Sequence, residues 1–219
     1  MRGTFGHRIM NLEPEERDDL IERILEGFRR SFPDSKASLR GSLSGGFGDE
    51  YSDIDIMWVI PRDHFAACLH RLHSILSEIQ PIESMRWDPE FRGNGNRRVV
   101  FVRFVDVPLF WRVDVDIRSD SDACPRLEIE QDRLPWSRTE SALMNAVAAI
   151  KAHLRDEDSD AVAFLSRAFN RIGLELPKRD LRSTISELLD AVEKMEPASA
   201  MLSDRIRVLV NNAFTEPGD

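Results

Sequence analysis

Apolar residues recur at helical spacing in two stretches of the N-terminal half. In residues 13–31 they fall three or four positions apart, and Pro33 follows the run. A second stripe of the same period extends from Phe65 to Ile79. Residues at this spacing share one face of a helix, so each stretch predicts an amphipathic helix with a single buried side.

Short runs of apolar residues, several with a two-residue period, separate and follow these helices. They are rich in β-branched and aromatic residues and read as strands at 37–43, 53–60, 82–87, 97–105 and 109–117. A "GNGN" turn and a "DVP" turn divide the last three runs. We therefore expect these three strands to form an antiparallel meander.

The pattern changes to purely helical in the C-terminal part of the chain. From about residue 137, four segments carry apolar stripes at helical spacing, and the preceding stretch is polar and irregular. We therefore predict an α+β fold with a mixed domain at 1–118, a linker at 119–136 and an all-helical domain at 137–219.

Composition restricts the function only broadly. The 219 residues carry a formal net charge of −9, which argues against binding to duplex nucleic acid and favours a cationic partner. No run approaches the roughly 20 apolar residues that cross a bilayer, and no signal segment is evident, so we expect a cytoplasmic protein without a membrane partner. Cys68 and Cys124 are expected to be reduced structural thiols.

Aspartates alternate with apolar residues in two of the predicted strands. In "DIDI", Asp53 and Asp55 share one face, and in "RVDVDI" the same is true of Asp114 and Asp116. Carboxylates that meet at close range resist joint ionisation, and a divalent cation removes that difficulty. Mg²⁺ prefers such oxygen ligands. If the two aspartate-bearing strands are neighbours in the sheet, they predict a magnesium site.

A glycine-rich turn precedes the first aspartate pair. The sequence "GSLSGGFG" begins at Gly41 and offers the hydroxyl groups of Ser42 and Ser44. Glycine lets the backbone approach a ligand closely, and exposed N–H and hydroxyl groups can bind phosphate oxygens. Phosphate is therefore the ligand that this turn predicts.

Together, "GSLSGGFGDEYSDID" and "RVDVDI" resemble the signature of the DNA polymerase β-like nucleotidyltransferase superfamily, and the first is most similar to the motif of kanamycin-type aminoglycoside nucleotidyltransferases. The resemblance covers roughly residues 35–118. It implies a polymerase β-like domain in which Gly41 and Ser42 contact the triphosphate. It also implies that Asp53, Asp55 and Asp114 act as catalytic residues and as ligands of two Mg²⁺ ions. The kanamycin-type enzymes have glutamate where Asp55 stands.

Some assignments stay open at this stage. Asp116 is an alternative to Asp114 as third ligand, because both share one face of their strand. Lys151 is a candidate phosphate ligand on a predicted helix, and an ordinary surface lysine is at least as good an interpretation. A general base can be Glu140, Glu83 or Asp114 itself.

The resemblance implies an enzyme that transfers a nucleoside monophosphate from an NTP, with ATP expected, to a hydroxyl group and releases pyrophosphate. The expected acceptor is a small molecule such as an aminoglycoside. The helical domain would complete its pocket or pack against a second subunit in a homodimer. One alternative is an antitoxin-like nucleotidyltransferase that adenylylates a partner protein, and another is a non-catalytic nucleotide-binding regulatory protein of the same fold.

Overall fold

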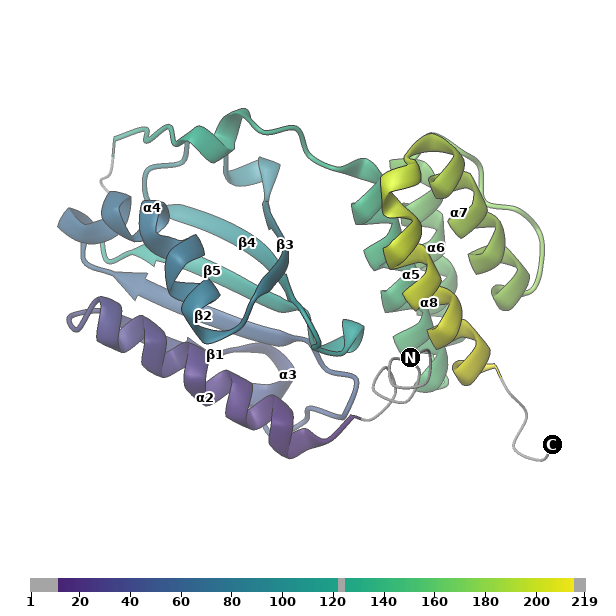
Figure 1. Ribbon diagram of the computed structural model, residues 1–219, viewed down its shortest axis with the longest axis horizontal. Coiled ribbons are helices and arrows are strands. Elements are labelled where there is room, and N and C mark those ends of the chain that lie inside the picture. The colour runs from purple at the N-terminus through teal and green to yellow at the C-terminus, as the bar shows by residue number, and fades with distance from the viewer. Residues whose placement is uncertain (1–11, 122–124, 215–219) are drawn as a thin grey trace. The chain divides into compact units, whose positions relative to one another are not determined.

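The computed structural model describes residues 12–121 and 125–214 (Figure 1). They form two compact units. One comprises the described residues from 12 to 136 and contains a sheet with helices, and the other is helical and begins at Ser137. The α+β class expected from the sequence is confirmed. Cys124 lies outside the described residues, and Cys68 is a buried free thiol.

The first unit is built on a five-stranded mixed sheet. Its strands are β1 Lys36–Leu39, β2 Ile54–Ile60, β3 Ile82–Trp87, β4 Arg97–Phe104 and β5 Val113–Ser119. They lie in the order β1-β2-β5-β4-β3. The central pair β2 and β5 is parallel and the other pairs are antiparallel, which confirms the predicted meander of β3, β4 and β5.

Two helices, α2 (Pro14–Ser31) and α4 (Arg62–Ile79), build the core with one face of the sheet. Residues of β2 alternate between buried and half-buried, as a strand covered on one side requires. Trp58 of β2 stacks on Phe28 of α2 with ring centroids 3.9 Å apart. In α2, a Cβ at Gly27 would lie 2.8 Å from the side chain of Ile79, so these two helices pack closely.

Two predicted strands are shorter than expected. The first ends at Leu39, because residues 41–44 form a single helical turn, α3 (Gly41–Ser44), which begins with a left-handed φ of 68°. The strand expected from residue 109 begins at Val113. Pro108 has no N–H to donate to a strand ladder, and the chain after it forms a 3₁₀ turn, η2 (Leu109–Trp111), before the strand starts.

The segment predicted as a linker packs on the sheet unit in its described part. It contains the 3₁₀ helix η3 (Glu130–Arg133). Arg98 of β4 is buried, pairs with Asp132 at 3.3 Å and donates a hydrogen bond to the carbonyl of Leu127. These buried polar contacts fix the segment to the end of β4.

In its described residues, 137–214, the second unit contains the four helices that the sequence predicts. They are α5 Arg138–Leu154, α6 Asp158–Arg171, α7 Leu181–Met195 and α8 Ala200–Ala213, with a 3₁₀ turn η4 at Pro197–Ser199. Helix α5 contacts each of the other three, and its residues Leu143, Val147 and Ile150 are fully or almost fully buried. Within the described part of the chain, none of the helices is long and apolar enough to cross a membrane.

Candidate active site

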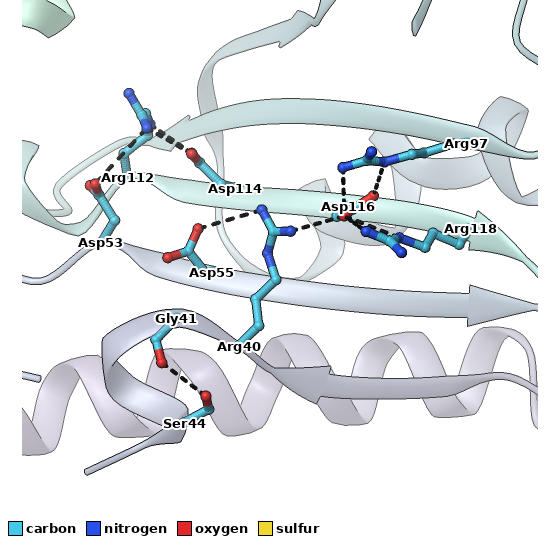
Figure 2. A network of polar contacts seen from close by, with 10 residues as sticks. All are labelled: Arg40, Gly41, Ser44, Asp53, Asp55, Arg97, Arg112, Asp114, Asp116 and Arg118. Atoms are coloured by element: carbon cyan, nitrogen blue, oxygen red, sulfur yellow. Dashed lines mark hydrogen bonds and ion pairs between the residues drawn. The ribbon is translucent and has the colours of Figure 1, made fainter. Parts of the chain in front are cut away.

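Three aspartates lie at the start of the two parallel central strands, on the sheet face that does not carry the Phe28 and Trp58 stack. Asp53 directly precedes β2, and Asp55 lies two residues further on. Asp55 is the register partner of Asp114 on β5. Paired residues on neighbouring strands point to the same side, so Asp114 stands beside Asp55 (Figure 2). Asp116 is the register partner of Met57, which lies two residues further along β2 than Asp55.

Arg112 links two of these carboxylates. Its Nε and Nη2 donate to the two carboxylate oxygens of Asp114 at 2.6 and 2.7 Å, and its Nη2 lies 3.9 Å from Oδ2 of Asp53 (Figure 2). The guanidinium group also lies over the ring of Phe101, 5.1 Å from its centroid. One cation is therefore shared between an aspartate at the start of β2 and one on β5.

The charges of the three aspartates affect one another. Burial raises the pKa of the Asp114 carboxyl to about 6, Arg112 acts against this rise, and the nearby charges of Asp53 and Asp55 add to it. Burial lowers the pKa of Arg112, but Asp114, Asp53 and Asp55 together raise it above its ordinary value. Arg112 is therefore a permanent cation in a field made by all three carboxylates.

Asp116 is enclosed by three arginines. Arg97 donates its Nε and Nη2 to the two carboxylate oxygens, at 2.9 and 3.0 Å. Arg118 and Arg40 each reach Oδ2, at 2.7 and 2.9 Å. Although burial raises the pKa of Asp116, the hydrogen bonds from Arg118 and Arg97 outweigh it, and the pKa lies below its ordinary value. Arg40 also lies 3.9 Å from Asp55, so it joins the two groups of aspartates.

The glycine-rich turn lies against Asp55. A Cβ at Gly41 would stand 2.5 Å from the Asp55 carboxylate, so any larger residue there would displace Asp55. Ser42 donates its hydroxyl to Ser52 at 3.2 Å. Ser44 donates to the Gly41 carbonyl at 2.9 Å (Figure 2). The structure thus brings Gly41 to the aspartates, while both serine hydroxyls bond within the loop.

The other candidate residues belong to other elements of the structure. Lys151 is buried in α5 of the helical unit, and Glu140 lies in the first turn of the same helix. Glu83 belongs to β3 and pairs with Arg103 at 2.9 Å. The predicted roles of these three residues stay predictions.

The donor chemistry of the aspartates fits Mg²⁺, whereas their present contacts do not yet form a metal site. As the side chains stand, no three His, Cys, Asp or Glu residues in the described ranges form a group that could hold a metal ion. However, Asp53 and Asp114 already approach one cation, the guanidinium of Arg112. Oxygen donors that converge on a positive charge suit Mg²⁺, provided that Arg112 moves away.

Sequence reasoning missed the arginines that contact these aspartates. The signal was present in "RVDVDIR", where every second residue from Arg112 to Arg118 is charged and therefore lies on the same face of the strand. Arg40 directly follows β1, and Arg97 is the first residue of β4. Both reach Asp116 only because the folded sheet brings these positions next to β5. Their approach depends on strand order, which the local pattern does not contain.

Comparison with known proteins gives one family match. A family model described as a nucleotidyltransferase domain matches residues 21–147, more than half of the chain. No match was found among curated proteins.

Solved structures with a similar fold include several nucleotidyltransferases. One is the RNA terminal uridylyl transferase Cid1, with 13% identity and a TM-score of 0.39, where the match covers 67% of this chain and 39% of that one. Another is the polymerase core of the TRAMP complex, with 17% identity, a TM-score of 0.36 and coverage of 93% and 58%. A third is an aminoglycoside 6-adenyltransferase from Bacillus subtilis, with 12% identity, a TM-score of 0.32 and coverage of 90% and 92%. The chain spans between 39% and 43% of the first three structures.

Proposed function

Because this chain belongs to the nucleotidyltransferase domain family and is an enzyme of that class, we propose that it transfers AMP from ATP to a hydroxyl group of a small molecule. The oxygen of the hydroxyl forms a bond to the α-phosphorus, and the bond from the α-phosphorus to the bridging oxygen breaks. Pyrophosphate leaves, and the hydroxyl proton passes to a carboxylate of the site. The observation that carries this proposal is the register of Asp55 with Asp114 beside Asp53.

Each residue of the site has a role in this proposal. Asp53, Asp55 and Asp114 would hold Mg²⁺, which supplies positive charge to the attacking and leaving oxygens when it is bound. Asp114 is also the proposed proton acceptor, because its carboxylate lies among the proposed metal ligands. Gly41 brings the backbone of the turn next to Asp55. The backbone N–H groups of this turn and Ser42 are the proposed contacts for the triphosphate.

The acceptor has two candidate classes. A small hydroxyl compound such as an aminoglycoside follows from the resemblance of the motif, and a partner protein is the alternative. The chemistry at the phosphorus is the same for both, so the aspartates do not distinguish them. The two classes differ only in the molecule that carries the transferred nucleotide after the reaction.

The transfer proposal is tested with ATP labelled at the α-phosphate and Mg²⁺. We expect Asp53→Asn to lower label transfer by about a hundredfold or more, because it removes a proposed metal ligand at unchanged volume. Asp63→Asn is the matched control, since it makes the same change at an exposed position in the first turn of α4. A folded Asp53→Asn variant with wild-type turnover would refute the role of Asp53.

The acceptor is identified in the same assay. Wild-type protein is incubated with labelled ATP and either a set of aminoglycosides or a lysate of the source cells. Label on a small molecule supports the first class, whereas label on a polypeptide band supports the partner protein. Parallel reactions with the other three NTPs determine the base preference.

A further inference from the structure

The three arginines around Asp116 carry more positive charge than that carboxylate can neutralise. Asp116 is fully buried and offers one negative charge, whereas Arg40, Arg97 and Arg118 offer three positive ones. Arg40 also approaches Asp55, but at 3.9 Å this is an ion pair without a hydrogen bond. Like charges that share one counter-ion repel each other, so a second anion at this place would be favourable.

The arginines are open to solvent, in contrast with Asp116. The side chains of Arg40, Arg97 and Arg118 are 37%, 34% and 43% exposed. A guanidinium group has five N–H donors, and Arg97 and Arg118 each direct only two nitrogens to Asp116. Arg97 also lies over the ring of Phe91, 4.3 Å from its centroid, and Arg40 turns Nη2 toward Asp55. The remaining exposed N–H groups of the three side chains can bind a ligand that arrives from solution.

Other ion pairs of the chain show what a purely structural arrangement looks like. Arg98 and Asp132 form a pair in which both side chains are buried. Arg207 has the opposite balance, with three acidic residues around one arginine, Asp190, Glu193 and Asp204. The cluster at Asp116 differs from both because it combines an excess of cations with exposed guanidinium groups beside the candidate active site.

We propose that Arg40, Arg97 and Arg118 form a binding site for a phosphate group of a substrate. Guanidinium groups complement phosphate oxygens in charge and can bind them with two parallel hydrogen bonds. The buried Asp116 carboxylate, which accepts hydrogen bonds from all three arginines, holds them in place. The phosphate belongs either to the nucleotide or to the acceptor, and the assignment to a substrate rests on the proposed function.

Phosphate binding is tested by calorimetric titration with pyrophosphate in the absence of divalent cations. We expect Arg118→Gln and Arg97→Gln each to weaken binding by about tenfold, the usual effect of losing a charged hydrogen bond. Each variant leaves Asp116 with two arginine partners, and thermal unfolding checks that the fold is kept. Arg126→Gln is the matched control, because its side chain is 74% exposed and pairs with Glu128 elsewhere.

A second titration, in protein saturated with a non-hydrolysable ATP analogue, identifies the source of the phosphate. If the analogue abolishes pyrophosphate binding, the site holds the nucleotide phosphates. If pyrophosphate still binds in an Arg118-dependent way, the site serves a phosphorylated acceptor. Wild-type affinity in both folded variants, or no pyrophosphate binding by the wild type, would overturn the proposal. The titration needs no turnover, so its failure leaves the transfer proposal standing, and failed transfer does not affect the titration.

Discussion

At the residue scale, the sequence predicts which side chains share a face and not which partners they meet. The two-residue period predicts that Asp53 shares a face with Asp55, and Asp114 with Asp116. The observed register adds that Asp55 pairs with Asp114, which brings the two sets to the same face. Arg112 has the same two-residue spacing from Asp114, but nothing in the local sequence shows that its guanidinium group contacts both Asp114 and Asp53. That contact depends on strand neighbours and on side-chain conformation.

Gly41 and Gly46 separate the effect of backbone strain from that of the approach to Asp55. Both have left-handed φ values, 68° and 72°, but only at Gly41 would a Cβ meet the Asp55 carboxylate. We expect Gly46→Ala to cost about 1 kcal/mol of unfolding free energy from strain alone. Gly41→Ala should cost more and should also lower transfer, because it displaces Asp55. Urea unfolding and the label assay measure both, and equal effects of the two substitutions would contradict the close approach.

Arg112 is expected to compete with a divalent cation for Asp114. Replacing it with methionine removes the competing charge and keeps much of the side-chain volume against Phe101. We expect Arg112→Met to bind Mn²⁺ about tenfold more tightly than the wild type, which corresponds to about 1.4 kcal/mol. Electron paramagnetic resonance of free Mn²⁺ measures this directly, and Arg118→Met is the control. Weaker or unchanged Mn²⁺ binding by folded Arg112→Met would show that Arg112 does not compete.

At the element scale, the positions of the helices and of three strands follow closely from the sequence, whereas the bounds of β1 and β5 and the sheet order do not. The predicted strand at 53–60 is observed as β2, and each predicted helical stripe became a helix. The parallel pairing of β2 with β5, which brings Asp55 to Asp114, joins segments separated by two other strands and a helix. Hydrophobic periodicity carries no information about such distant pairings.

The segment before the helical unit should depend on the buried pair of Arg98 and Asp132. Arg98→Met removes the cation and leaves Asp132 charged, although Ile129 N–H still donates to it. We expect a loss of about 3–5 kcal/mol of unfolding free energy, as for other broken buried ion pairs. The double variant Arg98→Met with Asp132→Asn should recover part of that loss. Urea unfolding tests this, and a single variant as stable as the wild type would contradict the assignment.

At the scale of the whole molecule, one motif and one alternating strand are enough to predict the family and the fold, but they do not identify the acceptor. The sequence suggested a cationic acceptor from the resemblance and from a net charge of −9. That acceptor stays a prediction. The sheet face beside the aspartates presents three arginines around one carboxylate. Net charge averages over the surface, whereas recognition depends on the local arrangement of charges.

We expect Asp116 to contribute to the loss of unfolding free energy at acidic pH. Its pKa is lowered in the folded state, so its contribution to stability is complete above the ordinary value of about 3.8. As the pH falls further and Asp116 takes up a proton, three arginines lose their counter-ion and that contribution disappears. We therefore expect the stability difference between wild type and Asp116→Asn to shrink from pH 6 to pH 3. Urea unfolding at several pH values measures it, and a constant difference would contradict the ion network.

We propose that Asp53 and Asp55, at β2, and Asp114 of β5 act together as one catalytic centre. A crystal structure with a non-hydrolysable ATP analogue and Mn²⁺, in which anomalous scattering locates the ion, tests this proposal. We expect a Mn²⁺ peak in contact with Asp53, Asp55 and Asp114, with the guanidinium of Arg112 turned away from Asp114. A bound nucleotide without such a peak, and with Arg112 still paired to Asp114, would contradict it.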